Sequence, residues 1–124
     1  MAKQGISVDI TGTKGVINAI KKYGEDGAKL VRNQTEASAR DTERGAKRLA
    51  PIDTGKLWQS IKAERQNSYW WTITAFIHYA RWVEFGTSRM MAQPFLFPNW
   101  RYYGKEYIKE LQRGFNDLAR KFNK

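Results

Sequence analysis

The sequence predicts a single α+β domain, with an N-terminal strand, a long helix, an antiparallel β-hairpin sheet, a short helix and a C-terminal amphipathic helix. Two observations predict this class. The chain has 124 residues, of which 41% are hydrophobic and 14% aromatic, which is enough for one core. Its apolar residues recur every second position in some segments and every three to four positions in others. Because it has no internal repeat, linker or low-complexity tract, residues 1–124 are expected to form one domain.

The N-terminal part reads as a strand followed by two helical runs. Residues 6–11, ISVDIT, alternate apolar and polar side chains, which predicts a half-buried strand. Helical spacing follows over residues 14–23 and again over residues 25–49, and Gly24 and Gly27 are expected to weaken or kink the run between them. The second run carries a stripe of mostly small side chains, which would let it lie close against a sheet or a neighbouring subunit. The stripe consists of Ala28, Val31, Thr35, Ser38, Thr42, Gly45 and Leu49.

A β-hairpin is predicted after Pro51, which ends the helix because proline cannot continue it. Alternation begins at Leu57 and continues through Ala63, and it resumes over residues 69–75. The polar residues 64–68, ERQNS, lie between the two runs and predict a loop of about five residues. Trp71 is expected on the apolar face of this hairpin and Trp70 on the opposite face.

The C-terminal third predicts a short helix, a loop and a long helix. Residues 79–85 can form one helical turn, with Gly86 as its C-cap. The following segment contains two prolines and no sustained period, so it is predicted to be a loop. An amphipathic helix is expected from about Asn99, and Lys105, Lys109, Arg113 and Arg120 lie off its apolar side. The apolar stripe consists of Trp100, Tyr103, Tyr107, Leu111, Phe115, Leu118 and Phe122.

The formal net charge of +10 makes binding to nucleic acid plausible, and a stand-alone basic nucleic-acid-binding module is the alternative function. The basic residues are nevertheless spread along the chain, and in the central helix they alternate with acidic ones, as in an ordinary solvated helix. A basic surface would be formed by Lys29, Arg32, Arg40, Arg44, Lys47 and Arg48.

The triplet Asp53-Thr54-Gly55 raises the question of an aspartic peptidase. A charged helix precedes it, whereas that chemistry needs a buried apolar strand, and Lys56 would hold the carboxylate ionised. We therefore interpret Asp53 as the first residue of an Asx-turn and Gly55 as a position of positive φ. With no cysteine and one histidine, His78, we expect no enzyme activity, metal or cofactor. The most apolar segment, residues 69–76, is too short to cross a membrane, so no membrane partner is expected.

Three segments together resemble the tail-completion, or head–tail joining, proteins of long-tailed bacteriophages. The first is Ala-Pro-x-Asp-Thr-Gly-x-Leu with a nearby Ser-Ile, after a basic helix. The second is Tyr-Ala with Val-Glu-x-Gly-Thr, and the third is Pro-Phe-Leu before the final helix. The first segment contributes Pro51, Asp53, Thr54, Gly55, Leu57, Ser60 and Ile61. The others contribute Tyr79, Ala80, Val83, Glu84, Gly86, Thr87, Pro94, Phe95 and Leu96. The chain departs from the family at Met91, where proline is more usual, and at Phe97, where a basic residue often follows.

This resemblance implies a structural virion protein that completes the tail and joins it to the DNA-filled head. Such a protein is a ring subunit of the neck, with sixfold symmetry, assembled in the host cytoplasm. The implied partners are further copies, a head-connector or stopper protein, a tail-terminator or tail-tube protein, and genomic DNA passing through the lumen.

The proline-flanked loop is the best candidate for a contact between rings. Its large apolar side chains are hard to bury in one small domain, although burial under the C-terminal helix is the alternative. Glu84 is expected to pair with Arg81, with Arg89 or with a neighbouring subunit. The candidate interface consists of Arg89, Met90, Met91, Phe95, Phe97 and Trp100.

Overall fold

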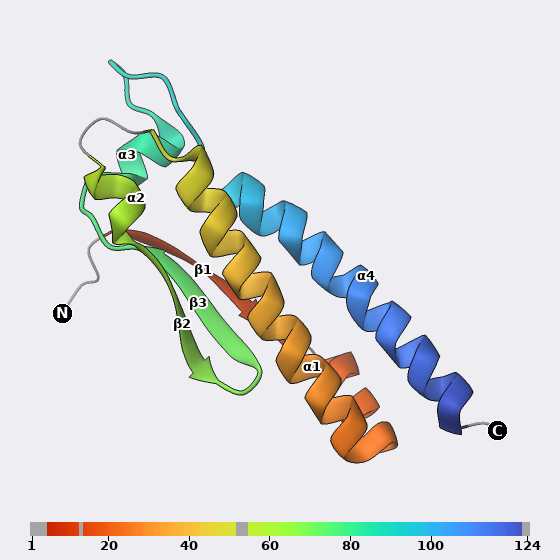
Figure 1. The fold of residues 1–124 in the computed structure, drawn as a ribbon. Coiled ribbons are helices and arrows are strands. Elements are labelled where there is room, and N and C mark those ends of the chain that lie inside the picture. Colours follow the sequence, from red (N-terminus) through yellow and green to blue (C-terminus); the bar gives the residue numbers. More distant parts are fainter. Residues whose placement is uncertain (1–4, 13, 52–54, 123–124) are drawn as a thin grey trace.

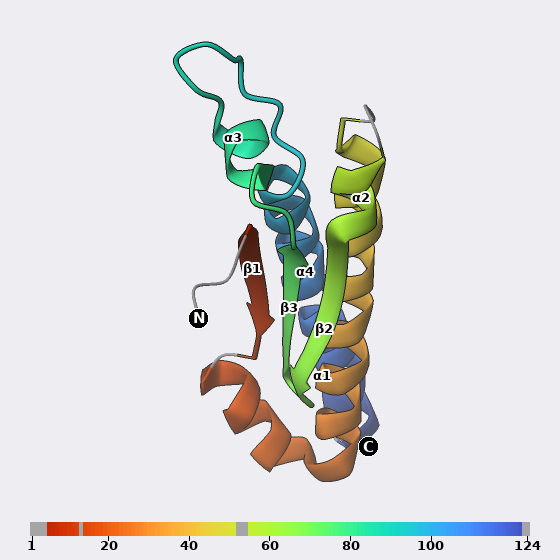
Figure 2. The same cartoon turned by 90° about the vertical axis from the view of Figure 1, so that its left-hand side faces the viewer.

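The computed structural model describes residues 5–12, 14–51 and 55–122, and it confirms the α+β class (Figure 1). A three-stranded antiparallel sheet forms one layer, and two long helices that lie side by side form the other (Figures 1 and 2). The elements in chain order are β1 (Ile6–Thr11), α1 (Lys14–Leu49), α2 (Lys56–Ser60), β2 (Ile61–Asn67), β3 (Trp70–Ala75), α3 (Ala80–Phe85) and α4 (Phe97–Phe122).

The sheet has the order β1-β3-β2, so the last strand in the chain lies in the centre. The predicted hairpin forms, but its connection is shorter than the five residues expected, because residues 64–67 pair with β3 through a bulge between Arg65 and Asn67. β2 is an edge strand whose second half is exposed, so the polar residues there belong to the strand and do not mark a turn. Trp71 is buried and Trp70 is exposed, as the alternation predicts.

The predicted start of the hairpin near Leu57 is wrong, because residues 56–60 form the short helix α2 and β2 begins at Ile61. Gly55 has φ of 78°, which confirms its expected positive φ, and its carbonyl accepts a hydrogen bond from the N–H of Gln59 at 3.2 Å. The buried side chain of Leu57 therefore belongs to a helical turn. The Asx-turn predicted at Asp53 lies outside the described residues.

Helix α1 is kinked at Gly24, where φ is 63° and ψ is −136°, as predicted. Figure 2 shows residues 14–23 running at a steep angle to the rest of the helix. The stripe of small residues is buried along residues 28–45, but Leu49 is 53% exposed and does not belong to it. Gly45 already faces Asn99 near the start of α4, so Leu49, one turn further along α1, extends past the end of its partner helix.

At Thr35, Ser38 and Gly45 the small residues of α1 contact α4, the long helix that lies beside α1. A Cβ added at Gly45 would overlap the side chain of Asn99, and one at Gly114 would lie 2.6 Å from the methyl carbons of Leu30. These contacts bring the two helices together in antiparallel directions. Because a methyl group at either glycine would collide with a side chain of the facing helix, both glycines have a packing role within the chain.

Hydroxyl groups also cross between α1 and α4 in the buried core. The Thr35 hydroxyl donates to the carbonyl of Val31 at 2.7 Å, so the Tyr107 hydroxyl, 2.8 Å away, is the donor to Thr35. Burial raises the pKa of Tyr107, and the hydrogen bond with Thr35 opposes this shift. The tyrosine is therefore held in its neutral, donating form.

Candidate interaction surfaces

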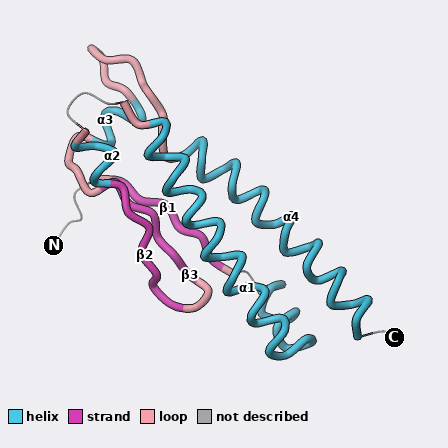
Figure 3. Tube along the Cα trace, viewed as in Figure 1, coloured by secondary structure: helices cyan, strands magenta, loops and turns pink. Residues whose placement is uncertain are grey.

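The loop between α3 and α4 extends beyond the helices and the sheet at one end of the molecule (Figure 3). It begins at Gly86, where φ is 75° and where a Cβ would lie 2.7 Å from the backbone nitrogen of Ala92. Thr87 and Met90 exchange backbone hydrogen bonds of 2.8 and 3.3 Å, which closes the tip, and the N–H of Gln93 donates to the carbonyl of Val83 at 2.8 Å. The tip is thus tied back to α3 by main-chain bonds, and Gly86 is confirmed as the residue that ends α3.

Glu84 anchors the other end of this loop. Its side chain is buried, and one carboxylate oxygen accepts the N–H groups of Phe95 and Leu96 at 3.1 and 2.9 Å, while the other accepts that of Phe97 at 3.2 Å. The expected ion pair within the chain is therefore wrong, since both oxygens are used by main-chain donors. These N–H groups lie at the start of α4, where a negative charge is favourable. Glu84 joins the Val-Glu-x-Gly-Thr segment to the Pro-Phe-Leu segment.

The candidate interface residues separate into three environments. Phe95 is fully buried together with Leu96, so this part of the prediction is corrected: the side chain fills the core and is not available to a partner. Phe97 and Trp100 are half-buried, and their rings lie 6.1 Å apart. Arg89, Met90 and Met91 are exposed at the tip, and Met91 is 86% exposed.

Exposed apolar side chains gather at this end of the molecule. Trp82 and Phe85 on α3 are 48% and 59% exposed, and α3 leads directly into the loop whose tip carries Met90 and Met91. We call these four residues the apolar end. Trp82 and Phe85 were not among the candidate interface residues, because in the sequence they fit the apolar side of a short helix. α2 and the end of α1 lie at the same end (Figure 1), so the residues of the Ala-Pro-x-Asp-Thr-Gly segment that are described also lie there.

The six predicted basic-surface residues all lie on α1 and are exposed or half-exposed, but much of their charge is balanced within the helix. Residues 25–49 contain six basic and five acidic side chains, a net charge of +1. Arg32 pairs with Glu25 at 3.0 Å, and this hydrogen bond raises the pKa of the guanidinium. Two further ion pairs link Arg40 to Glu43 at 3.7 Å and Arg44 to Asp41. Binding of DNA by this surface stays a prediction.

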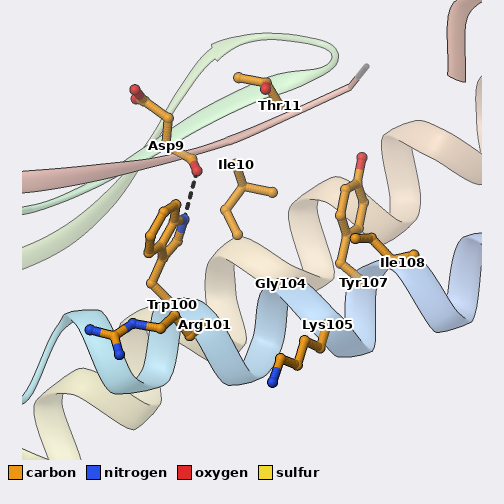
Figure 4. Close-up of a pocket in the computed structure, with 9 residues that line it drawn as sticks. All are labelled: Asp9, Ile10, Thr11, Trp100, Arg101, Gly104, Lys105, Tyr107 and Ile108. Carbon is orange, nitrogen blue, oxygen red and sulfur yellow. Dashed lines mark hydrogen bonds between the residues drawn. The ribbon is translucent and has the colours of Figure 1, made fainter. Parts of the chain in front are cut away.

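A groove separates β1 from α4 on the side of the molecule shown in Figure 4. Its volume is about 320 Å³. The Trp100 indole N–H donates to the backbone carbonyl of Asp9 at 2.8 Å across one end. The sequence placed Trp100 on the apolar stripe of the last helix and among the candidate interface residues, but it did not predict the groove. The signal available for it was a glycine, Gly104, inside an otherwise regular helix. The lining consists of Asp9, Ile10, Thr11, Trp100, Arg101, Gly104, Lys105, Tyr107 and Ile108.

Within the described residues, no three acidic or histidine side chains are arranged to hold a metal ion. In the same part of the chain, none of the helices is both long and apolar enough to cross a membrane. The features that the structure does show are the apolar end, the basic surface of α1, the groove, and the loop held by Glu84.

Comparison with models of protein families gives a match over residues 14–86, to the family described as "Bacteriophage HK97-gp10, putative tail-component". The match covers more than half of the chain, from the start of α1 to the glycine that ends α3. It includes the Asp-Thr-Gly triplet and Glu84 but ends before the Pro-Phe-Leu segment and α4. Searches of curated proteins and of solved structures find no match.

Proposed function

Since this chain belongs to the HK97-gp10-like family of phage tail components, we propose that it acts in the phage neck, as a ring subunit that completes the tail and joins it to the DNA-filled head. Family membership makes the chain a structural tail protein of the virion. The position in the neck, the ring and the joining step are our proposal.

The observation that carries this proposal is the apolar end. A subunit of a stacked ring needs a surface for its axial neighbour, and aromatic and methionine side chains are enriched at such interfaces. Trp82, Phe85, Met90 and Met91 present that chemistry at the end of an elongated domain. Main-chain bonds and the Glu84 anchor hold the loop in place before any partner binds, which lowers the conformational cost of assembly.

The proposed partners follow from this placement. Copies of the chain form a closed ring through heterologous side contacts, and sixfold symmetry would match that of the tail tube. A head-connector or stopper protein lies on one side of the ring, and a tail-terminator or tail-tube protein lies on the other. The genome passes through the lumen, where the net charge of +10 favours weak, salt-dependent contact with DNA.

A phage with a stop codon in this gene tests the proposal when it is complemented with plasmid-borne variants. Electron microscopy of the lysates should show separate heads and tails, or heads joined to defective tails, without complementation. The wild-type gene should restore joined particles, and Met90→Ser/Met91→Ser should restore fewer. Tyr102→Ser is the matched control, because Tyr102 is 59% exposed on α4 and is not one of the four residues of the apolar end.

Normal, infectious, joined particles from the uncomplemented phage would overturn the neck assignment. Equal rescue by the double variant and the control would reject the apolar end as the contact surface.

A further inference from the structure

Among the residues that the structure describes, one long edge of β1 carries no further strand beside the groove, and β1 pairs only with β3. The N–H of Gly12 donates to the carbonyl of Tyr69 at 3.0 Å. In an antiparallel pair the hydrogen-bonded positions alternate, so Ile10 and Val8 bond to β3, while the N–H and C=O groups of Ser7, Asp9 and Thr11 point away from it. Within the described residues, only the Trp100 indole bonds to this edge, at the Asp9 carbonyl. Such an edge is a template for another strand.

Gly104 is a second feature of the groove that the fold itself does not explain. A Cβ at this position would meet nothing within 4 Å, whereas those at Gly45 and Gly114 would strike the facing helix. A glycine inside a helix costs about 1 kcal/mol relative to alanine. Since no packing contact in the described part of the chain requires a glycine here, Gly104 leaves room for something that approaches α4 from outside.

The charges of the groove form the third feature. Four cations of α4 have acidic partners: Lys109 with Glu106 at 3.6 Å, Arg113 with Glu110 at 3.2 Å, Lys121 with Asp26 at 3.7 Å, and Arg120 with Asp117. Arg101 and Lys105, which line the groove, make no ion pair with any described residue. Both are exposed, and they lie one helical turn apart beside the groove (Figure 4).

We propose that this groove binds an extended acidic segment of a partner protein, which adds to β1 as a fourth strand. Its main chain pairs with the outward groups of Asp9 and Thr11. Its apolar side chains lie on the face of the added strand that turns toward Gly104, and its carboxylates lie on the opposite face, within reach of the long exposed side chains of Arg101 and Lys105. Residues two apart on a strand lie about 6.6 Å apart on one face, and Arg101 and Lys105 lie about 6 Å apart along the helix axis. The segment therefore carries two carboxylates separated by one residue. This proposal is independent of the position in the neck.

A different protein, and not a second copy of this chain, is the occupant. The exposed cations Arg101 and Lys105 favour an acidic segment, whereas this chain has a net charge of +10. Its only two acidic residues separated by one position are Asp41 and Glu43, which lie within α1 and are not available as a strand. A helix is also the poorer occupant, because its main-chain groups are already paired and cannot bond to the β1 edge.

Fluorescence anisotropy with a labelled peptide of about nine residues, alternating Glu and Val, tests the proposal on the whole chain. Gly104→Leu should fold at least as stably as the wild type, because the site is open and leucine favours helix, and it should block the groove. Arg101→Gln/Lys105→Gln should weaken binding about tenfold or more. Lys109→Gln/Arg113→Gln removes the same charge from the same helix outside the groove, and it should change the affinity less than about threefold.

Pairing with β1 is tested separately by N-methylation of the peptide. Methylation at alternate positions should abolish binding for one of the two alternating sets and spare the other, because only one set donates to β1. The proposal is overturned by absence of saturable binding up to about 1 mM peptide, by equal binding to all three variants, or by equal binding of the corresponding Lys-Val peptide. Displacement of the peptide by a short DNA duplex, with Gly104→Leu abolishing both, would instead assign the groove to nucleic acid.

Discussion

Residues 87–91 lie in the connection between α3 and α4, and residues 95–97 lie where this connection enters α4. Both segments contain large apolar side chains, yet they lie in different environments. Phe95 is fully buried, while Met91 is 86% exposed. The difference follows from the main chain. Glu84 accepts three N–H groups of residues 95–97 and holds that segment against the core, whereas the tip is closed by bonds within itself and to α3. Both segments are hydrophobic, so their hydrophobicity does not explain why one is buried and the other exposed. The hydrogen bonds of Glu84 do.

Of the variants proposed here, Phe95→Ala should reduce the free energy of unfolding most. Removing a fully buried aromatic side chain leaves a cavity, so the free energy of unfolding should fall by about 3–5 kcal/mol, measured by urea denaturation. Phe95→Leu, which keeps much of the volume, should cost less than half as much. A loss below 1 kcal/mol for the alanine variant would mean that this half of the loop is not packed as described.

Glu84→Gln should weaken the anchor by about 2–3 kcal/mol. The amide oxygen can still accept two N–H groups, but the NH₂ group then faces the third donor, and the negative charge at the start of α4 is lost. Chemical denaturation and amide hydrogen exchange of residues 95–97 measure the effect. Glu36→Gln is the control, since Glu36 is exposed on α1 and should change stability by less than about 0.5 kcal/mol. Equal losses in the two variants would contradict the anchoring role.

Gly86→Ala should cost about 2 kcal/mol, because φ is 75° and the new methyl group would lie 2.7 Å from a backbone nitrogen. Thermal denaturation measures the loss, and hydrogen exchange should show it centred on residues 87–93. Gly104→Ala is the matched glycine control, and it should stabilise the chain by up to about 1 kcal/mol. A neutral Gly86 variant would show that the tip tolerates other backbone conformations.

The fold was largely predictable because its signals are local. The alternation of residues 6–11 predicts the backbone of that segment, and Gly24 and Gly27 predict a kink in theirs. Both the strand and the kink at Gly24 were confirmed. The errors arose where a distant part of the chain decides the outcome. Leu49 has the periodicity of a core residue but lies beyond the start of α4, and the polar residues 64–67 extend an edge strand.

The surfaces were harder to predict for the same reason. Burial of Phe95 depends on the hydrogen bonds that Glu84 makes, eleven positions earlier in the chain. From the sequence alone, an acidic residue among apolar ones suggests an ion pair as readily as hydrogen bonds to main-chain N–H groups. The groove depends on β1 and α4, whose contacting residues Asp9 and Trp100 are separated by 91 positions. Only Gly104 gave a local signal of the groove, because it is a glycine inside an otherwise regular helix.

Substitutions in the tip, residues 87–91, should have the smallest effect on stability. This small effect distinguishes the tip from residues 95–97. Met90→Ser/Met91→Ser removes the side chains of Met91, which is 86% exposed, and of Met90, which is 38% exposed, so the unfolding free energy should change by less than about 1 kcal/mol in urea. Unlike Phe95→Ala, the double variant should keep a normal stability and still give a reduced yield of joined particles. If the double variant were destabilised as strongly as the Phe95 variant, the tip would be part of the core and any assembly defect would be a folding defect. A stable variant that assembles poorly would locate the role of Met90 and Met91 in contact with a partner.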